Sequence, residues 1–238
     1  MHVDELVTTT GDWTPEKAAA MIDHSLLKPN LIESDLEKGI NEALGHCFFN
    51  VTVNPDQVSF SKEKVRGSSV KVCSVVSFPF GLSKTEVKVM ETREAIRDGA
   101  DEIDMVLNIG AERSHNYDLV FTDAKAVVDA ARKMDESVKV KAILETCYLT
   151  DDEKISACEA SVKAGMDFVK TSTGYGTAGA TMHDVVLMRR VVGPNIGVKA
   201  AGGIRDAKAF LALASAGANR IGTSHSVEIM KELASGLR

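Results

Sequence analysis

Two lysines occupy matching places in two neighbouring predicted strands. Lys170 ends the run Phe168-Val169-Lys170, and Lys199 lies between Val198 and Ala200. Neighbouring parallel strands lie about 4.8 Å apart, so two ammonium groups that face the same side are close. Burial and like-charge repulsion both favour the neutral amine, so at least one of the two lysines should have a lowered pKa. A neutral lysine amine can attack a carbonyl group and form an imine.

Two alternatives stay open for this pair. In the first, a lysine at the end of a strand simply extends its ammonium group into solvent. The matched position of the second lysine argues against this solvent-exposed placement. The two amines would also titrate as a coupled pair, so the pattern does not say whether Lys170 or Lys199 is the nucleophile.

Carboxylates lie in two other predicted strands. Glu102 and Asp104 point to one face of their strand, because side chains alternate with a period of two. A carboxylate beside two lysines offsets their repulsion and can relay protons through water, although a structural salt bridge explains Asp104 taken alone equally well. Asp23, near the end of the first predicted strand, is expected to support the site or to cap a loop. His24 fits a buried core histidine, and no second histidine has the spacing of a metal site.

Glycine-rich turns follow the last three predicted strands. Glycine lets a ligand approach the backbone closely, and a helix that begins after the turn adds N–H groups and a favourable dipole for an anion. In a β/α barrel the loops after the seventh and eighth strands are the usual phosphate site, although each glycine pair alone also fits an ordinary turn. The residues predicted to hold a phosphate group are Gly174, Gly202, Gly203, Gly222 and Ser224.

Eight short strands alternate with helical patterns along the chain. Several are continuous apolar runs, as expected for strands of a parallel sheet that are buried on both faces. The predicted strands are Ala20–His24, Cys47–Val53, Val70–Phe78, Glu102–Leu107, Val138–Glu145, Phe168–Thr173, Ile196–Ala200 and Arg220–Gly222.

Helix start signals lie between the strands. Capping residues mark the start of a helix, and proline at the first helical position or a Ser/Thr-x-x-Glu capping box strengthens the signal. The predicted capping residues are Thr14, which precedes Pro15; Ser83 and Thr150, each with a glutamate three residues later; Thr181; Asp206; and Ser226, whose helix runs toward Leu237.

These β/α units predict one (β/α)8 TIM-type barrel, which spans residues 1–238 as a single domain with a short N-terminal helix. An open doubly wound sheet is the alternative, and it usually carries a glycine-rich fingerprint after its first strand. Here the first strand is followed by Ser25-Leu26, with no glycine, which favours the barrel.

The composition narrows the class of partner. A net charge of −6 over 238 residues argues against nucleic acid as the main partner. No apolar run approaches the roughly 18 residues of a membrane span, and Met1–Pro15 lacks the apolar core of a signal peptide, so we expect a cytoplasmic protein that binds no membrane. Homo-oligomer formation is left open. The cysteines form no metal or redox pattern, and Cys47 and Cys147 are expected on strands.

Four motifs occur in the order in which deoxyribose-phosphate aldolases carry them: Ile22–Pro29, Gly99–Asp104, Phe168–Gly174 and Gly197–Arg205. The chain therefore resembles that family over nearly its whole length. The resemblance implies a class I aldolase without metal or cofactor. Such an enzyme reversibly cleaves 2-deoxy-D-ribose 5-phosphate to D-glyceraldehyde 3-phosphate and acetaldehyde through a lysine Schiff base.

The resemblance also implies roles for single residues. Lys170 forms the imine, Lys199 lowers the pKa of Lys170 and assists proton transfer, and Asp104 donates and accepts protons. The residues expected to support them are Asp23, Thr52 and Thr171. Thr52 stands where many members have cysteine. Tyr175 stands where members vary, which leaves the phosphate affinity open.

Two competing functions remain. Another Schiff-base barrel aldolase, such as a transaldolase or a bisphosphate aldolase, would form the same imine on a different sugar. The second competing function is that of a barrel that has lost catalysis and serves as a binding scaffold. The presence of Lys170, Lys199 and Asp104 argues against it.

Overall fold

Eight parallel strands close into a barrel. In the computed structural model, which describes residues 13–236, each strand pairs with the next in chain order and β8 pairs with β1. This closure confirms the predicted (β/α)8 TIM-type barrel and excludes the open doubly wound sheet. The strands are β1 (Ile22–Leu26), β2 (Asn50–Val53), β3 (Lys71–Val76), β4 (Glu102–Val106), β5 (Lys139–Ile143), β6 (Phe168–Lys170), β7 (Gly197–Ala201) and β8 (Arg220–Thr223).

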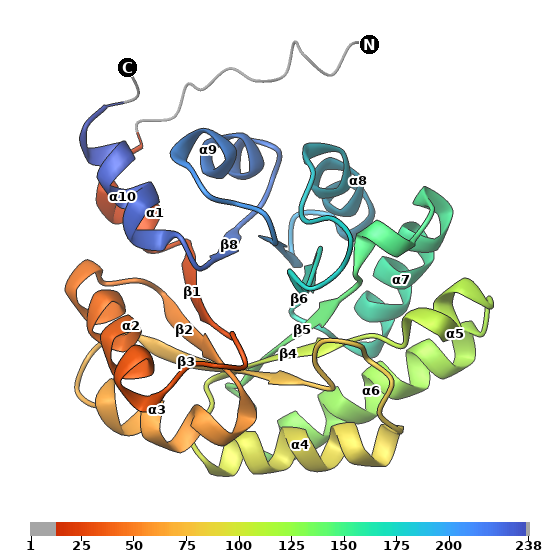
Figure 1. The fold of residues 1–238 in the computed structure, drawn as a ribbon. Coiled ribbons are helices and arrows are strands. Elements are labelled where there is room, and N and C mark those ends of the chain that lie inside the picture. Colours follow the sequence, from red (N-terminus) through yellow and green to blue (C-terminus); the bar gives the residue numbers. More distant parts are fainter. Residues whose placement is uncertain (1–12, 237–238) are drawn as a thin grey trace.

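Helices surround the barrel on its outside (Figure 1). The first helix lies beside the last one, where β8 joins β1. Within residues 13–236, no helix is both long and apolar enough to cross a lipid bilayer. The helices are α1 (Pro15–Ala19), α2 (Glu33–His46), η2 (Pro55–Gln57), α3 (Val58–Lys64), α4 (Thr85–Arg97), α5 (Ile109–Arg113), α6 (Tyr117–Met134), η3 (Thr146–Tyr148), α7 (Asp151–Ala164), α8 (Met182–Val192), α9 (Ala207–Ser215) and α10 (Ser226–Ala234).

Side-chain caps begin four helices where the sequence predicts them. The side chains of Thr14, Thr150, Thr181 and Asp206 accept backbone N–H groups at the starts of α1, α7, α8 and α9. Thr150 and Glu153 form the full capping box, in which the carboxylate of Glu153 accepts the N–H of Thr150 at 2.7 Å. Each such cap contributes about 1 kcal/mol to helix stability.

The predicted cap of α4 is wrong. The helix begins at Thr85, after Lys84, which makes no side-chain cap. The predicted capping residue, Ser83, instead donates its backbone N–H to Ser77 Oγ at 3.1 Å. Ser83 therefore belongs to the turn after β3, and the helix starts later than the capping box indicated.

The predicted cap of α10 is also wrong, because Ser226 is the first residue of the helix rather than its cap. Its hydroxyl donates to the carbonyl of Thr223 at 3.2 Å and lies 2.9 Å from Nδ1 of the buried His24. Ser226 thus links α10 to β1 through its hydrogen bond with His24. The helix ends at Ala234, and Leu237 lies outside the described residues.

Strand side chains alternate between two environments. On β4, Ile103 and Met105 belong to the apolar layer between the strands and the helices. Glu102 and Asp104 point the other way, into the barrel, where they meet side chains of other strands such as Lys141. Apolar burial of about 25 cal/mol per Å² therefore stabilises the outside of the sheet, while ionisable groups gather on the barrel axis.

A buried carboxylate on α5 makes stability depend on pH. Glu112 is only 1% exposed, and burial raises its pKa to about 7, with Ser156 opposing the shift and Glu153 reinforcing it. Since the pKa is raised in the folded state, this group stabilises the fold fully only below its ordinary pKa. That contribution is lost as the pH rises through about 7.

We expect Glu112→Gln to raise the melting temperature at pH 8 and to leave it nearly unchanged at pH 5. The gain at pH 8 should be about 1–2 kcal/mol after allowance for solvent screening. Calorimetry at both pH values measures it, with Glu136→Gln, an exposed glutamate on the surface, as the matched control. An equal effect at both pH values would contradict a buried carboxylate that titrates near neutrality.

Candidate active site

Asp104 lies at the centre of a buried cluster of ion pairs. Its Oδ2 atom accepts from Lys170 Nζ and from Lys199 Nζ, each at 2.8 Å, and its Oδ1 atom accepts from Lys141 Nζ at 2.8 Å. These residues come from the neighbouring strands β4 to β7, whose inward-facing side chains meet on the barrel axis. The structure thus brings together the three residues that the sequence predicts as catalytic and adds Lys141.

A second layer of charges lies beneath, at the starts of the strands. Lys141 Nζ also lies 2.7 Å from Glu102 Oε2, and Lys199 Nζ lies 2.5 Å from Asp23 Oδ2. Arg220 joins the two carboxylates, with its guanidinium 2.8 Å from Asp23 Oδ1 and 3.4 Å from Glu102 Oε2. All five side chains are buried.

The charges of this cluster balance only when one lysine is neutral. An unbalanced buried charge costs several kcal/mol, and an arginine does not lose its proton in proteins, so the neutral group must be a lysine amine. The carboxylates are Asp23, Glu102 and Asp104, and the four basic groups are Lys141, Lys170, Lys199 and Arg220.

Lys170 is the lysine whose surroundings favour the neutral amine. Burial lowers the pKa of Lys170; Asp104 opposes this shift and Lys199 reinforces it. Burial acts on Lys199 as well, but the attraction of Asp104 and Asp23 outweighs it and raises the pKa. The same balance, with Asp104 as the main attraction, raises the pKa of Lys141 well above its ordinary value.

The carboxyl group of Asp104 is held in its charged form. Burial alone would raise its pKa, but Lys141, Lys170 and Lys199 together hold the pKa well below the usual range. An ionised carboxylate in contact with a neutral amine can accept a proton from a reacting group and pass it on.

A cavity of about 320 Å³ opens above the cluster. It lies at the ends of β1, β6, β7 and β8, and Lys170 is the member of the ion-pair cluster that reaches it, although the side chain is only 2% exposed. Gly222 makes room for the second lysine, because a Cβ atom there would lie 3.1 Å from Lys199 Cε. A carbonyl compound in this cavity therefore meets the amine of Lys170 first.

Every residue predicted to hold a phosphate group lines this cavity. The three loop glycines, Gly174, Gly202 and Gly203, have φ angles of +88°, +87° and +75°, which L side chains rarely adopt, so their backbone N–H groups are presented by a conformation that needs glycine. Three basic side chains join the five predicted residues in the lining: Lys28, Arg205 and His225.

The two helices that begin near the glycine-rich end of the cavity, α9 and α10, differ in what their first N–H groups can bind. At α9, the N–H groups of Ala207 and Ala209 already donate to the carboxylates of Glu232 and Asp206, each at 2.7 Å. At α10, no side chain caps the first turn. The sequence predicts that both helices favour a phosphate group, whereas in the structure more of the first N–H groups are left for it at α10 than at α9.

Tyr175 closes part of the cavity. Its hydroxyl donates to the carbonyl of Leu27 after β1 at 2.8 Å, and its ring meets Phe78 edge-on, with centroids 5.4 Å apart. Glu145 holds the start of this loop, since its carboxylate accepts the N–H of Thr173 at 3.2 Å and also the Thr173 hydroxyl. The loop after β6 is thus tied to the loops after β1, β3 and β5.

The remaining predicted residues lie beside the cavity rather than in its lining. Thr52 is fully buried and donates to Asn50 Oδ1 at 3.1 Å. Thr171 bonds to both backbone groups of Ala201, accepting at 3.1 Å and donating at 3.2 Å, so it links β6 to β7. Asp23 contacts Lys199 in the lower layer.

The cysteines are placed differently from the prediction. Cys47 follows α2 and Cys147 lies in η3, so neither is on a strand. Cys73 on β3 instead faces the cluster, with Sγ 3.2 Å from Asp104 Oδ1. Burial and the charge of Asp104 raise the pKa of Cys73 to about 12, so it is a thiol at neutral pH rather than a nucleophile.

Lys141 and Arg220 are functional candidates that the sequence pattern did not identify, and Glu102 was placed beside Asp104 but given no role in the site. Lys141 carries the same signal as Lys199, a lysine between apolar residues inside a strand. Its meeting with Asp104 depends on the register of β4 and β5, which pairs the two residues directly.

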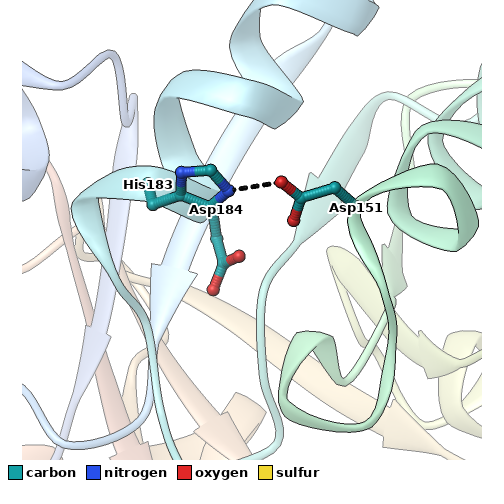
Figure 2. A group of neighbouring side chains, drawn as sticks. All are labelled: Asp151, His183 and Asp184. Atoms are coloured by element: carbon teal, nitrogen blue, oxygen red, sulfur yellow. Dashed lines mark hydrogen bonds and ion pairs between the residues drawn. The ribbon is translucent and has the colours of Figure 1, made fainter.

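A separate cluster of Asp151, His183 and Asp184 lies between α7 and α8 (Figure 2). His183 Nε2 is 2.7 Å from Asp151 Oδ2. The ammonium group of Lys154 lies 2.7 Å from Asp184 and 3.1 Å from Asp151, so a cation of the protein already pairs with both carboxylates. This cluster therefore joins two helices by ion pairs.

Comparisons with known proteins agree on one family. The model of the DeoC/LacD family of aldolases matches residues 17–228. The deoxyribose-phosphate aldolase of Streptococcus sanguinis is 54% identical over 216 residues, which is 90% of this chain and 96% of the relative. That of Thermococcus gammatolerans is 54% identical over 215 residues, 90% and 95% of the two chains. The tetrameric deoxyribose phosphate aldolase structure from Aeropyrum pernix superposes with a TM-score of 0.87 at 32% identity and covers 93% of each chain.

Proposed function

This chain belongs to the DeoC/LacD family of aldolases, and on that premise we propose that it cleaves 2-deoxy-D-ribose 5-phosphate reversibly to D-glyceraldehyde 3-phosphate and acetaldehyde. The observation that carries the proposal is the buried amine of Lys170, which opens into a cavity with a glycine-rich, basic end. The names of the close relatives support the same substrate.

The reaction begins when the neutral amine of Lys170 adds to the C1 aldehyde of the open-chain sugar. Loss of water from the adduct gives a protonated imine. The positive nitrogen replaces the oxygen of the carbonyl and withdraws electrons from C2. Asp104, whose Oδ2 lies 2.8 Å from Lys170 Nζ, is placed to stabilise this cation.

The C2–C3 bond then breaks. The C3 hydroxyl loses its proton and becomes the aldehyde of glyceraldehyde 3-phosphate, while the bond electrons pass to C2 and form an enamine with C1 and the nitrogen. Asp104 and Lys199 take up the hydroxyl proton through water and return a proton to C2. Hydrolysis of the resulting imine releases acetaldehyde and restores the amine of Lys170.

The phosphate group should govern binding more than chemistry. Unphosphorylated 2-deoxyribose should have a kcat/KM about 100-fold lower, mainly through KM, because it loses charge-assisted hydrogen bonds worth about 1.5–3 kcal/mol each. Steady-state rates of acetaldehyde release measure this ratio. Arg205→Gln, which removes a basic side chain from the cavity, should narrow the difference between the two sugars. Equal kcat/KM values for both sugars in the unmodified enzyme would contradict the phosphate site.

Substrate turnover separates this proposal from its competitors. Acetaldehyde release from 2-deoxyribose 5-phosphate, followed with an acetaldehyde-reducing coupling enzyme, is the expected result. A transaldolase or a bisphosphate aldolase would form an imine but would not release acetaldehyde from this sugar, and a non-catalytic scaffold would release none from any sugar.

A further inference from the structure

Glu102 and Arg220 lie beneath the groups that would meet the substrate. Glu102 Oε2 pairs with Lys141 Nζ at 2.7 Å, and Arg220 pairs with Asp23. The guanidinium carbon of Arg220 lies 3.4 Å from the ring centroid of Phe49, and the same arginine also lies over Phe168. Neither Glu102 nor Arg220 is part of the cavity lining. These two residues are therefore not placed to contact the substrate directly.

Their charges nevertheless reach Lys170 through a continuous chain of ion pairs. Glu102 pairs with Lys141, and Lys141 shares Asp104 with Lys170. Arg220 acts along the opposite side, through Asp23 and Lys199. Both chains lie in the barrel interior, where charges are screened much less than at the surface.

The balance of the whole cluster then determines the state of one group. Three carboxylates and the three other basic groups cancel when Lys170 is uncharged. We propose that Glu102 and Arg220 are positioning residues that set the pH at which Lys170 becomes the free amine, by fixing the net charge beneath it. This inference rests on the imine mechanism proposed above and adds two residues that no contact with the substrate would identify.

Other ionisable groups also lie around Lys170 and are present in every variant. Burial raises the pKa of Glu145, whose carboxylate is bound by Thr173, and Cys73 is a thiol at neutral pH. The groups that act on Lys170, or that pair with its neighbours Asp104 and Lys199, are Asp104 of β4, Lys141 of β5, Lys199 of β7, Asp23 of β1, Cys73 of β3 and Glu145 after β5.

The test measures the pH dependence of imine formation in the full chain. Acetaldehyde is the probe, cyanoborohydride traps the imine, and the initial rate of modification at Lys170 is recorded from acid to alkaline pH. Glu102→Gln removes a negative charge, which disfavours the ammonium form and should move the acidic midpoint about one pH unit lower. Arg220→Gln removes a positive charge and should move the midpoint about one pH unit higher.

Three further variants distinguish charge from structural damage. The double variant Glu102→Gln/Arg220→Gln restores the balance and should return the midpoint to that of the unmodified enzyme. Arg220→Lys keeps the charge but loses the guanidinium geometry, and it should also keep that midpoint. Glu94→Gln removes a glutamate of an exposed ion pair on the surface and should have no effect.

If one of the two single variants does not fold, the other still tests the proposal, because the midpoint is expected to shift in a different direction in each. Unchanged midpoints, shifts in the same direction, or a double variant that is not restored would overturn the role of Glu102 and Arg220 while leaving the imine intact. No adduct on Lys170 in the unmodified enzyme would instead overturn the proposed function, and this inference with it.

Discussion

Lys170→Met should reduce kcat/KM for 2-deoxyribose 5-phosphate by at least about four orders of magnitude, the scale seen when a covalent nucleophile is removed. Methionine has no amine and cannot form the imine. It is also uncharged, like the free amine, so the buried cluster keeps its charge balance. We therefore expect the melting temperature to stay near that of the unmodified enzyme while activity is lost.

Two comparisons make this result specific. Lys170→Arg should be equally inactive, because a guanidinium stays protonated, but it should also be less stable, because it forces an extra positive charge into the cluster. Lys231→Arg, at an exposed position of α10, should change neither property. Activity above about one per cent of normal in the methionine variant would show that another group performs the chemistry.

Asp104→Asn should lower kcat by about 10²–10⁴-fold, the usual range for a lost acid–base group. The asparagine amide cannot relay the proton of the C3 hydroxyl. Its NH2 group also cannot accept hydrogen bonds from the lysines that share the carboxylate in the unmodified enzyme. The excess positive charge should keep Lys170 neutral, so the variant should still form an imine with acetaldehyde. A steady-state assay and borohydride trapping of the same preparation measure the two effects.

Glu102→Gln is the matched control for this substitution, since it removes the same charge from the same strand, two residues earlier. It leaves the carboxylate of Asp104 in place, so at a pH above the acidic midpoint its kcat should fall far less. Equal losses of kcat in the two variants would mean that Asp104 acts by charge alone rather than by proton transfer. Loss of trapping in Asp104→Asn would assign it to imine formation instead.

The barrel could be predicted because its signals are local. Several strands are short apolar runs, and capping residues such as Thr150 and Asp206 mark the helices that follow. The pairing of Lys170 with Lys199 could also be predicted, because both residues sit in matching positions on consecutive strands, which pair in register in the structure.

What could not be predicted depends on contacts between distant residues. Glu102, Lys141 and Arg220 belong to three strands, and their joint charge becomes visible only when the barrel closes. The two cap predictions that failed, at Ser83 and Ser226, did so because each residue forms hydrogen bonds with a neighbouring segment instead.

The glycine-rich end of the cavity shows the same limit. The glycine-rich turns identified loops that all line the cavity. Local sequence could not show that Glu232, from α10, accepts the N–H of Ala207 and so occupies the start of α9. Likewise, the bond from Tyr175 to the carbonyl of Leu27 joins segments 148 residues apart.

Identifying the lysine that forms the imine is the most direct test of the proposed mechanism. The unmodified enzyme is incubated with acetaldehyde, reduced with borohydride and digested, and its peptides are analysed by mass spectrometry. We predict a two-carbon adduct on the peptide that contains Lys170, because its pKa is lowered and its side chain reaches the cavity. An adduct on Lys199 or Lys141, with Lys170 unmodified, would contradict the proposed role of Lys170.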